Sequence, residues 1–102
     1  MTFNLQNQEE IIKHYGIDNQ LTIHMEECAE LIQAINKCRR IEGEIPNFEY
    51  QHLLEEISDV IVCIGQLQHI FNISDYSIEY VANAKIERQK RRMLNESKRN
   101  ST

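Results

Sequence analysis

Two ten-residue stretches of the chain each place three carboxylates within an apolar run. They read EECAELIQAI at residues 26–35 and EEISDVIVCI at residues 55–64. Ligands that are all oxygen select a hard divalent cation, Mg²⁺ first and Mn²⁺ next. If the two stretches face one another, their residue types therefore predict a metal site.

Helical geometry decides whether these acids can converge. At about 100° per residue, the three acids of each stretch lie within one arc of about 100°. The positions match between the two helices: Glu26, Glu27 and Glu30 on the first, and Glu55, Glu56 and Asp59 on the second. Ile23 and Ala34 share the first arc, while Val62 and Cys63 share or border the second. Acids bordered by apolar groups tend to be partly buried, and buried carboxylates need partners.

The opposite arc of each helix is an apolar stripe. Its members on the first helix are Leu21, Met25, Cys28, Leu31, Ile32 and Ile35, and on the second Leu53, Leu54, Ile57, Val60, Ile61, Ile64 and Leu67. A single acidic motif on such a helix is more often a solvated face than a site. Two carboxylates about 4 Å apart repel by about 4 kcal/mol at an effective dielectric constant of about 20. The acids therefore either stay apart in water or surround a cation.

The elements that must position these acids are predicted to be four helices. Their approximate ranges are 7–15, 19–40, 48–71 and 75–94. The predicted N-caps of the four helices are, in order, Asn7, Asp18 or Asn19, Asn47, and Ser74 or Asp75. Asn7 would form a capping box with Glu10, and Gly16 would end the first helix. The sequence EGEIPN is a short connection, which favours an antiparallel second and third helix with their acids opposed.

The fold class expected is all-α, a compact bundle of about four helices. Residues 1–94 would form a single domain, and residues 95–102 a frayed polar tail. The 102 residues contain 41% hydrophobic and 26% charged residues, which excludes a wholly disordered chain. We expect a cytoplasmic protein with no membrane partner, since no stretch is long and apolar enough to span a bilayer and no signal peptide is apparent. Of the three cysteines, Cys28 and Cys63 fall in the repeats and are expected to be small buried hydrophobes.

The charge of −5 divides unevenly along the chain. Residues 1–80 carry 14 acids and 4 bases, and residues 81–102 carry 7 bases and 2 acids. In the last helix Lys85, Arg88 and Arg92 continue the face that begins with Ile78 and Val81. Bases on such a face are suited to the oxygens of a metal-bound polyphosphate.

Taken together, EECAE, EEISD and the following NAKIERQKRR resemble the MazG-like all-α nucleoside triphosphate pyrophosphohydrolases over residues 20–92. The resemblance implies attack of water on the α-phosphorus of a nucleoside triphosphate, which yields a monophosphate and pyrophosphate. It implies Mg²⁺, or Mn²⁺, held by Glu27, Glu30, Glu56 and Asp59, with Glu26 and Glu55 as catalytic groups or further ligands. It implies phosphate binding by Lys85 and Arg88, with Asn83 and Arg92 as additional candidates.

The resemblance also points to a homodimer or homotetramer. A chain of this size buries only about two-thirds of its unfolded surface. The run VIVCI at residues 60–64 needs more cover than three neighbouring helices provide.

Three other classes of protein fit parts of the pattern. A di-iron protein needs Glu-x-x-His, and neither acid motif has histidine at that place. A non-catalytic helical oligomerisation or regulatory module would pair its acids and bases between subunits. Nucleic-acid binding through residues 85–99 is disfavoured by the acidic body of the chain. Within the resemblance, the base of the nucleotide stays open among general, dCTP- or dUTP-selective and phosphoribosyl-ATP activities.

Overall fold

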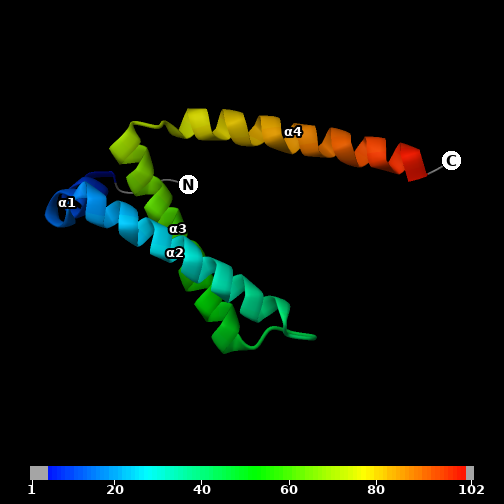
Figure 1. Ribbon diagram of the computed structural model, residues 1–102, viewed down its shortest axis with the longest axis horizontal. Helices are drawn as coiled ribbons and strands as arrows, with labels where there is room; N and C mark the ends of the chain where they lie inside the picture. The colour runs from blue at the N-terminus through cyan, green and yellow to red at the C-terminus, as the bar shows by residue number, and fades with distance from the viewer. Residues whose placement is uncertain (1–4, 101–102) are drawn as a thin grey trace. The chain divides into compact units, whose positions relative to one another are not determined.

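The chain folds into helices joined by short connections. A computed structural model describes residues 5–100 and contains α1 (Leu5–Tyr15), α2 (Ile17–Arg39), α3 (Asn47–Phe71) and α4 (Asp75–Asn100) (Figure 1). The described residues contain no strand, so the predicted all-α class is confirmed. Helices α1 to α3 form one unit and α4 forms a second.

Helices α2 and α3 form an antiparallel pair, as the short connection predicts. At the end near the connection, the Cys38 thiol donates a hydrogen bond to the carbonyl oxygen of Glu49 at 3.8 Å. At the other end, Gln20 Nε2 donates to Gln66 Oε1 at 2.9 Å. Helix α1 packs on both helices of the pair (Figure 1). The two acidic stretches therefore lie at the same level of the pair, on helices that run in opposite directions.

Gly16 both ends α1 and precedes α2. Its φ of 90° is costly for any residue with a Cβ atom, so glycine suits this turn. Its N–H donates to the Ile12 carbonyl at 2.8 Å, and its own carbonyl accepts from the N–H of Gln20 at 3.1 Å. The predicted caps Asp18 and Asn19 are wrong for this reason, because both lie inside the first turn of α2. Asn19 instead donates from Nδ2 to the Tyr15 carbonyl at 2.8 Å.

Of the other predicted caps, Asn7 and Asn47 are wrong and Ser74 is confirmed. Asn7 lies inside α1, which already begins at Leu5, so the capping box is wrong. Asn47 is the first residue of α3, and the N-cap before it is a proline. Ser74 is a cap as predicted, because its Oγ accepts a hydrogen bond from the N–H of Ser77 at 3.1 Å.

Helix α4 extends beyond its predicted end at Leu94. It continues to Asn100, so residues 95–100 belong to the helix, while residues 101–102 lie outside the described part. None of its residues is buried within its own unit. No helix in the described range is both long and apolar enough for a transmembrane span.

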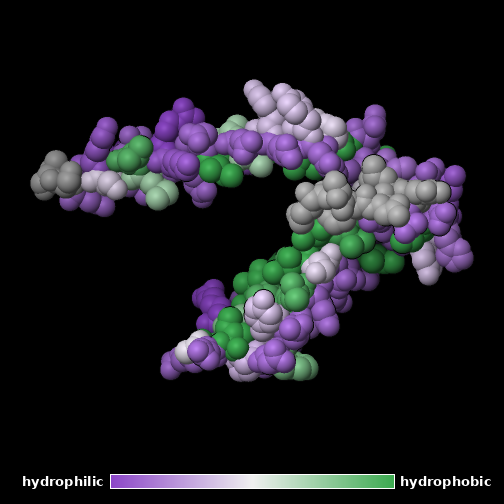
Figure 2. All heavy atoms as spheres, turned by 180° about the vertical axis from the view of Figure 1, so that it is seen from behind, coloured by the Kyte–Doolittle hydropathy of each residue, from purple (hydrophilic) through white to green (hydrophobic). Residues whose placement is uncertain are grey.

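The interior of the α1–α3 unit is unusually polar. Among the described residues only three apolar side chains are buried, namely Ile12, Ala34 and Cys63, against five polar ones, namely Gln8, Gln20, His24, Glu56 and Gln66. The apolar stripe of α2 instead faces outward, with Met25 68% exposed and Ile32 60% exposed. Figure 2 shows apolar residues gathered on the surface of this unit, whereas α4 is mostly hydrophilic.

This arrangement explains which of the two cysteines in the acidic stretches is buried. Cys63 is buried as predicted, since it borders the acid face, which is the face that packs inside the unit. The same expectation for Cys28 is wrong, because Cys28 belongs to the outward stripe and is exposed.

Candidate metal centre

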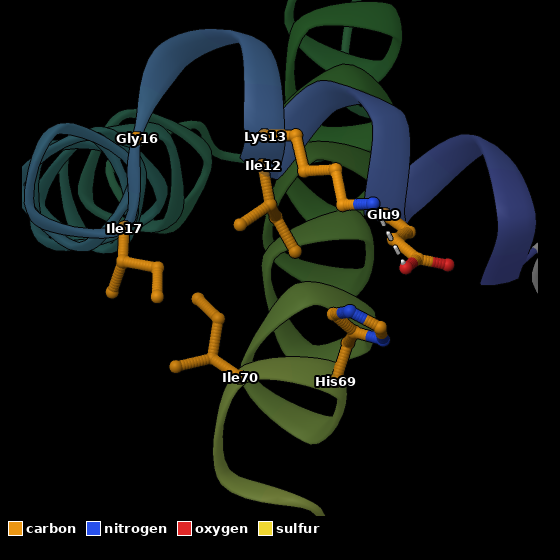
Figure 3. Close-up of a pocket in the computed structure, with 7 residues that line it drawn as sticks. All are labelled: Glu9, Ile12, Lys13, Gly16, Ile17, His69 and Ile70. Atoms are coloured by element: carbon orange, nitrogen blue, oxygen red, sulfur yellow. Dashed lines mark ion pairs between the residues drawn. The ribbon is translucent and has the colours of Figure 1, made fainter.

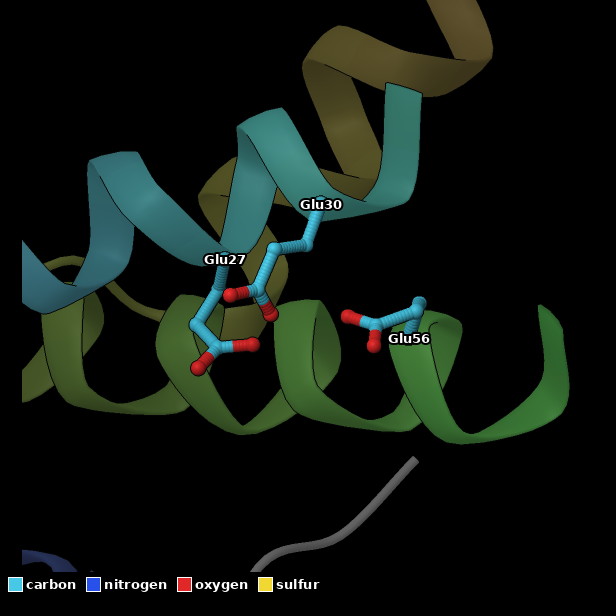
Figure 4. A group of neighbouring side chains, drawn as sticks. All are labelled: Glu27, Glu30 and Glu56. Carbon is cyan, nitrogen blue, oxygen red and sulfur yellow. The ribbon is translucent and has the colours of Figure 1, made fainter. Parts of the chain in front are cut away.

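Three carboxylates from the two acidic stretches meet between α2 and α3. One oxygen each of Glu27, Glu30 and Glu56 lies within 4.8 Å of the other two (Figure 4). Glu27 and Glu30 are one helical turn apart on α2, so both project from the same side toward α3. The convergence follows from the antiparallel pairing and from the matched angular positions of the two motifs.

Two oxygens of this group are buried without hydrogen-bond donors. Glu56 is 8% exposed, and neither its Oε2 atom nor that of Glu27 has a hydrogen-bond partner in the described part of the chain. A buried carboxylate oxygen that no donor satisfies is destabilising. A bound divalent cation would supply the missing partner for both oxygens, and three carboxylates within this span suit such an ion.

Burial and mutual repulsion raise the pKa values of the same groups. The pKa of Glu27 is raised from 4.5 to about 7, chiefly by desolvation and also by the negative charges of Asp59, Glu30 and Glu56. Burial also raises the pKa of Glu56, together with the charges of Glu30 and Asp59, and nearby His52 opposes the rise. These shifts show that a full set of negative charges at this place is unfavourable without a positive partner.

The remaining predicted acids lie around the cluster. Asp59 is exposed, does not belong to the group within 4.8 Å, and lines a small cavity together with Glu27. Glu26 and Glu55 are both exposed and lie outside the convergent group. Each is one residue from a converging glutamate, and a step of about 100° turns it away.

His52 is a neighbour that the sequence analysis did not assign. Its Nε2 atom lies 3.4 Å from Glu56 Oε1, one helical turn earlier on α3. The i, i+4 spacing of His52 and Glu56 is the sequence signal that was missed.

A second polar group, also missed, lies beside the carboxylates. Gln66 Oε1 accepts hydrogen bonds from Gln20 Nε2 at 2.9 Å and from His24 Nε2 at 2.6 Å. All three side chains are buried, with exposures of 4–5%. They line a cavity of about 150 Å³, whose other lining residues are Ile23, Glu27, Asp59, Val62 and Cys63.

Another cavity, of about 380 Å³, lies where α1 and α2 meet the end of α3 (Figure 3). Its lining contains Glu9, Lys13 and His69 among aliphatic residues. Glu9 and Lys13 already pair with each other at 3.5 Å. Because Lys13 pairs with the Glu9 carboxylate, this cavity lacks the unpaired negative charge found at Glu27, Glu30 and Glu56.

The predicted phosphate-binding residues lie on α4. Lys85, Arg88 and Arg92 line one shallow cavity of about 250 Å³ together with Gln89, so they share a face of the helix as predicted. Asn83 is not in this lining, since two residues before Lys85 it points to the other side of the helix. The structure thus groups the predicted site residues into an acidic set within the α1–α3 unit and a basic set within α4.

Comparison with known proteins gives no relative. No family model matches the chain, and neither a curated protein nor a solved structure matches it.

Proposed function

We propose that the protein is a divalent-metal-dependent hydrolase that cleaves nucleoside triphosphates to nucleoside monophosphates and pyrophosphate. The observation that carries this proposal is the convergence of Glu27, Glu30 and Glu56 with two buried oxygens that lack donors. The resemblance of the two acid motifs and the basic helix to MazG-like pyrophosphohydrolases supplies the reaction class.

The carboxylates of the cluster fit Mg²⁺ or Mn²⁺, which prefer oxygen ligands. Glu27, Glu30 and Glu56 would hold the ion, and Asp59, next to Glu27 at the cavity, would complete the set. An ion at this place supplies neutralisation of phosphate charge and a lower pKa for its water. Glu26 and Glu55, exposed on the flanks, would act on water or on a further ion.

The basic face of α4 would bind the phosphates. Lys85, Arg88 and Arg92 present several donors on one side of the helix, and guanidinium groups bind phosphate oxygens in a bidentate manner. Asn83 has no place in this face, so its role in binding is the weakest part of the proposal.

Self-association, as a homodimer or homotetramer, is part of the same proposal. Exposed apolar side chains follow the outward side of α2 and α3, among them Met25, Ile32, Ile35, Leu54, Ile57 and Ile64. Large apolar side chains exposed in such number mark an interaction site. A second copy of the chain would cover it.

The test is release of pyrophosphate from a panel of ribo- and deoxyribonucleoside triphosphates with and without Mg²⁺. We expect release that needs the metal and yields the monophosphate. Release of inorganic phosphate with a diphosphate product would contradict the bond assignment. No turnover of any nucleotide with Mg²⁺ or Mn²⁺ would refute the enzyme.

The second candidate function is a non-catalytic oligomerisation or regulatory module. The exposed apolar stripe favours it, because that stripe serves assembly whether or not the acids bind metal. Such a module would self-associate and show no Mg²⁺-dependent release of pyrophosphate.

A further inference from the structure

His52 and Glu56 lie one turn apart on α3, and their side chains meet. His52 Nε2 is 3.4 Å from Glu56 Oε1. An ionised carboxylate only accepts hydrogen bonds, so beside a Glu56 that binds a cation the Nε2 atom of His52 carries a proton. The contact is longer than an ordinary N–H···O hydrogen bond of about 2.9 Å, and hydrogen bonds in functional sites often shorten when a ligand binds. His52 is therefore a donor within reach of one oxygen of Glu56.

The two oxygens of Glu56 have different surroundings. Oε1 lies next to His52 Nε2, whereas Oε2 is buried without a hydrogen-bond partner in the described part of the chain. One of the two lies within 4.8 Å of an oxygen of Glu27 and of Glu30, and Figure 4 shows the carboxylate directed toward Glu30. A carboxylate placed in this way gives one oxygen to a donor on its own helix and the other to an ion.

The position of His52 differs from that of a metal ligand. Among the described residues, the possible ligand atoms that lie within 4.8 Å of one another belong to three glutamates, and the group contains no histidine nitrogen. His52 is therefore joined to the cluster through Glu56. A histidine that contacts a ligating carboxylate in this way acts on the ion by orienting that carboxylate.

Phe48 restricts the orientation of the His52 ring. It lies one turn before His52 on α3, and the two rings stack with their centroids 6.4 Å apart and their planes 21° apart. Residues four apart are neighbours on a helix, so Phe48, His52 and Glu56 form one row along α3. The imidazole is thus placed between an aromatic ring, which favours one orientation of its plane, and the carboxylate that it contacts.

We infer that His52 is a positioning residue of the candidate metal centre, which binds one oxygen of Glu56 and keeps the carboxylate turned toward the two glutamates of α2. The inference rests on the metal centre of the proposed function and is independent of hydrolysis. A side chain that is held in place before the ion arrives loses less rotamer freedom when it binds. Partners of this kind typically account for about 10–100-fold in metal affinity.

The first experiment compares two substitutions of His52. Glutamine carries an N–H donor at the same number of bonds from Cβ as His52 Nε2, and leucine carries none. Free Mn²⁺ is measured by electron paramagnetic resonance during a titration of each protein. We expect His52→Leu to raise the dissociation constant of Mn²⁺ by about 10–100-fold and His52→Gln to stay within about threefold of wild type. A merely structural role of the imidazole would affect both variants alike.

The matched control is a second histidine of the same helix. His69 is exposed on α3 and lies outside the carboxylate group, so His69→Leu should leave the dissociation constant of Mn²⁺ unchanged. A rise in His69→Leu as large as that in His52→Leu would overturn the inference. Equal losses of affinity in His52→Leu and His52→Gln, or no loss in His52→Leu, would overturn it as well.

A second experiment begins from the wild-type protein. Electron spin echo envelope modulation of bound Mn²⁺ detects directly bound nitrogen, and we expect no such nitrogen from His52. A coupling that is lost in His52→Gln would make His52 a ligand and overturn the positioning role. A wild-type protein that binds no Mn²⁺ would refute the metal centre together with this inference. Tight Mn²⁺ binding that depends on His52 as expected, in a protein that cleaves no nucleotide, would support the inference and refute the hydrolase.

Discussion

The inner face of the α2–α3 pair is largely polar and the outer face is largely apolar. The inner face, which packs inside the unit, carries Glu27, Glu56 and the Gln20–His24–Gln66 group. The outer face carries the apolar stripe, with Ile32 60% exposed. Burial of apolar area is the main favourable term in folding, so a helix pair normally packs the other way round. Under the proposed function, the polar interior would serve binding and the apolar exterior would serve assembly.

The largest expected effect comes from removing the negative charge of Glu56 on the inner face. Glu56→Gln removes one charge from the cluster, and we expect metal-dependent turnover to fall by at least about 100-fold, the upper range for residues that only support a metal ligand. The metal-free variant should melt at the same temperature as wild type or higher, since repulsion is relieved. Steady-state kinetics and thermal denaturation measure the two effects.

Glu96→Gln is the matched control for this variant. Glu96 is exposed on α4, and the same neutralisation there should change neither turnover nor melting temperature. Full activity of Glu56→Gln, with its melting temperature still raised by Mg²⁺, would show that the acids are only a solvated face.

A charge placed on the outer face should weaken self-association and leave the carboxylate cluster unchanged. Ile32→Asp places a charge in the exposed stripe, and we expect the dissociation constant of the oligomer to rise by about 30-fold, as for a residue central to an interface. Gln33→Asp, on the next residue of α2, should leave it unchanged. Sedimentation velocity over a range of concentrations measures this, and a wild-type protein that is monomeric at micromolar concentration would refute the role of the stripe.

The inner face can also be weakened away from the acids. Gln66→Leu removes the oxygen that accepts from both Gln20 and His24, and leaves two buried donors without partners. We expect the free energy of unfolding to fall by about 1–3 kcal/mol. Gln51→Leu, at an exposed position of α3, should change it little. Urea denaturation compares the two, and equal stability would show that the Gln66 hydrogen bonds contribute nothing net.

A smaller effect should appear in the pH dependence of stability. The pKa of Glu27 is raised from its ordinary 4.5 to about 7 in the folded protein, so folding favours the protonated carboxyl. The stability that this group contributes is complete below pH 4.5 and is lost as the pH rises through 7. Metal-free Glu27→Gln should therefore show a flatter decline in melting temperature between pH 4.5 and 8 than wild type. Parallel curves for the two proteins would contradict the assigned pKa.

Much of the fold was predictable from the sequence. The breaks at Gly16, at EGEIPN and before Ser74 separate the helices correctly, because glycine, proline and capping residues act through local geometry. Local rules failed at Asn7, Asp18 and Asn19, which are good caps in isolation. Gly16 ends α1 and is also the N-cap of α2, and the cap preferences of single residues do not show this double role.

The site was predictable to the extent that periodicity determines it. Matched angular positions predicted that the acids of the two motifs converge, and the structure brings Glu27, Glu30 and Glu56 together. How much of the apolar stripes stays exposed was not predictable from one chain, since an apolar stripe normally indicates the core. Gln20, His24 and Gln66 were missed for the same reason. Polar residues on a face are assigned to solvent unless the partner helix is known.

The most direct test of the account is to locate a metal. Crystals grown with Mn²⁺ give an anomalous signal that identifies the ion without reference to activity. We expect one peak between α2 and α3 at about 2.0–2.2 Å from oxygens of Glu27, Glu30 and Glu56, and no peak there in Glu56→Gln. Wild-type crystals with millimolar Mn²⁺ and no peak among these three carboxylates would contradict it.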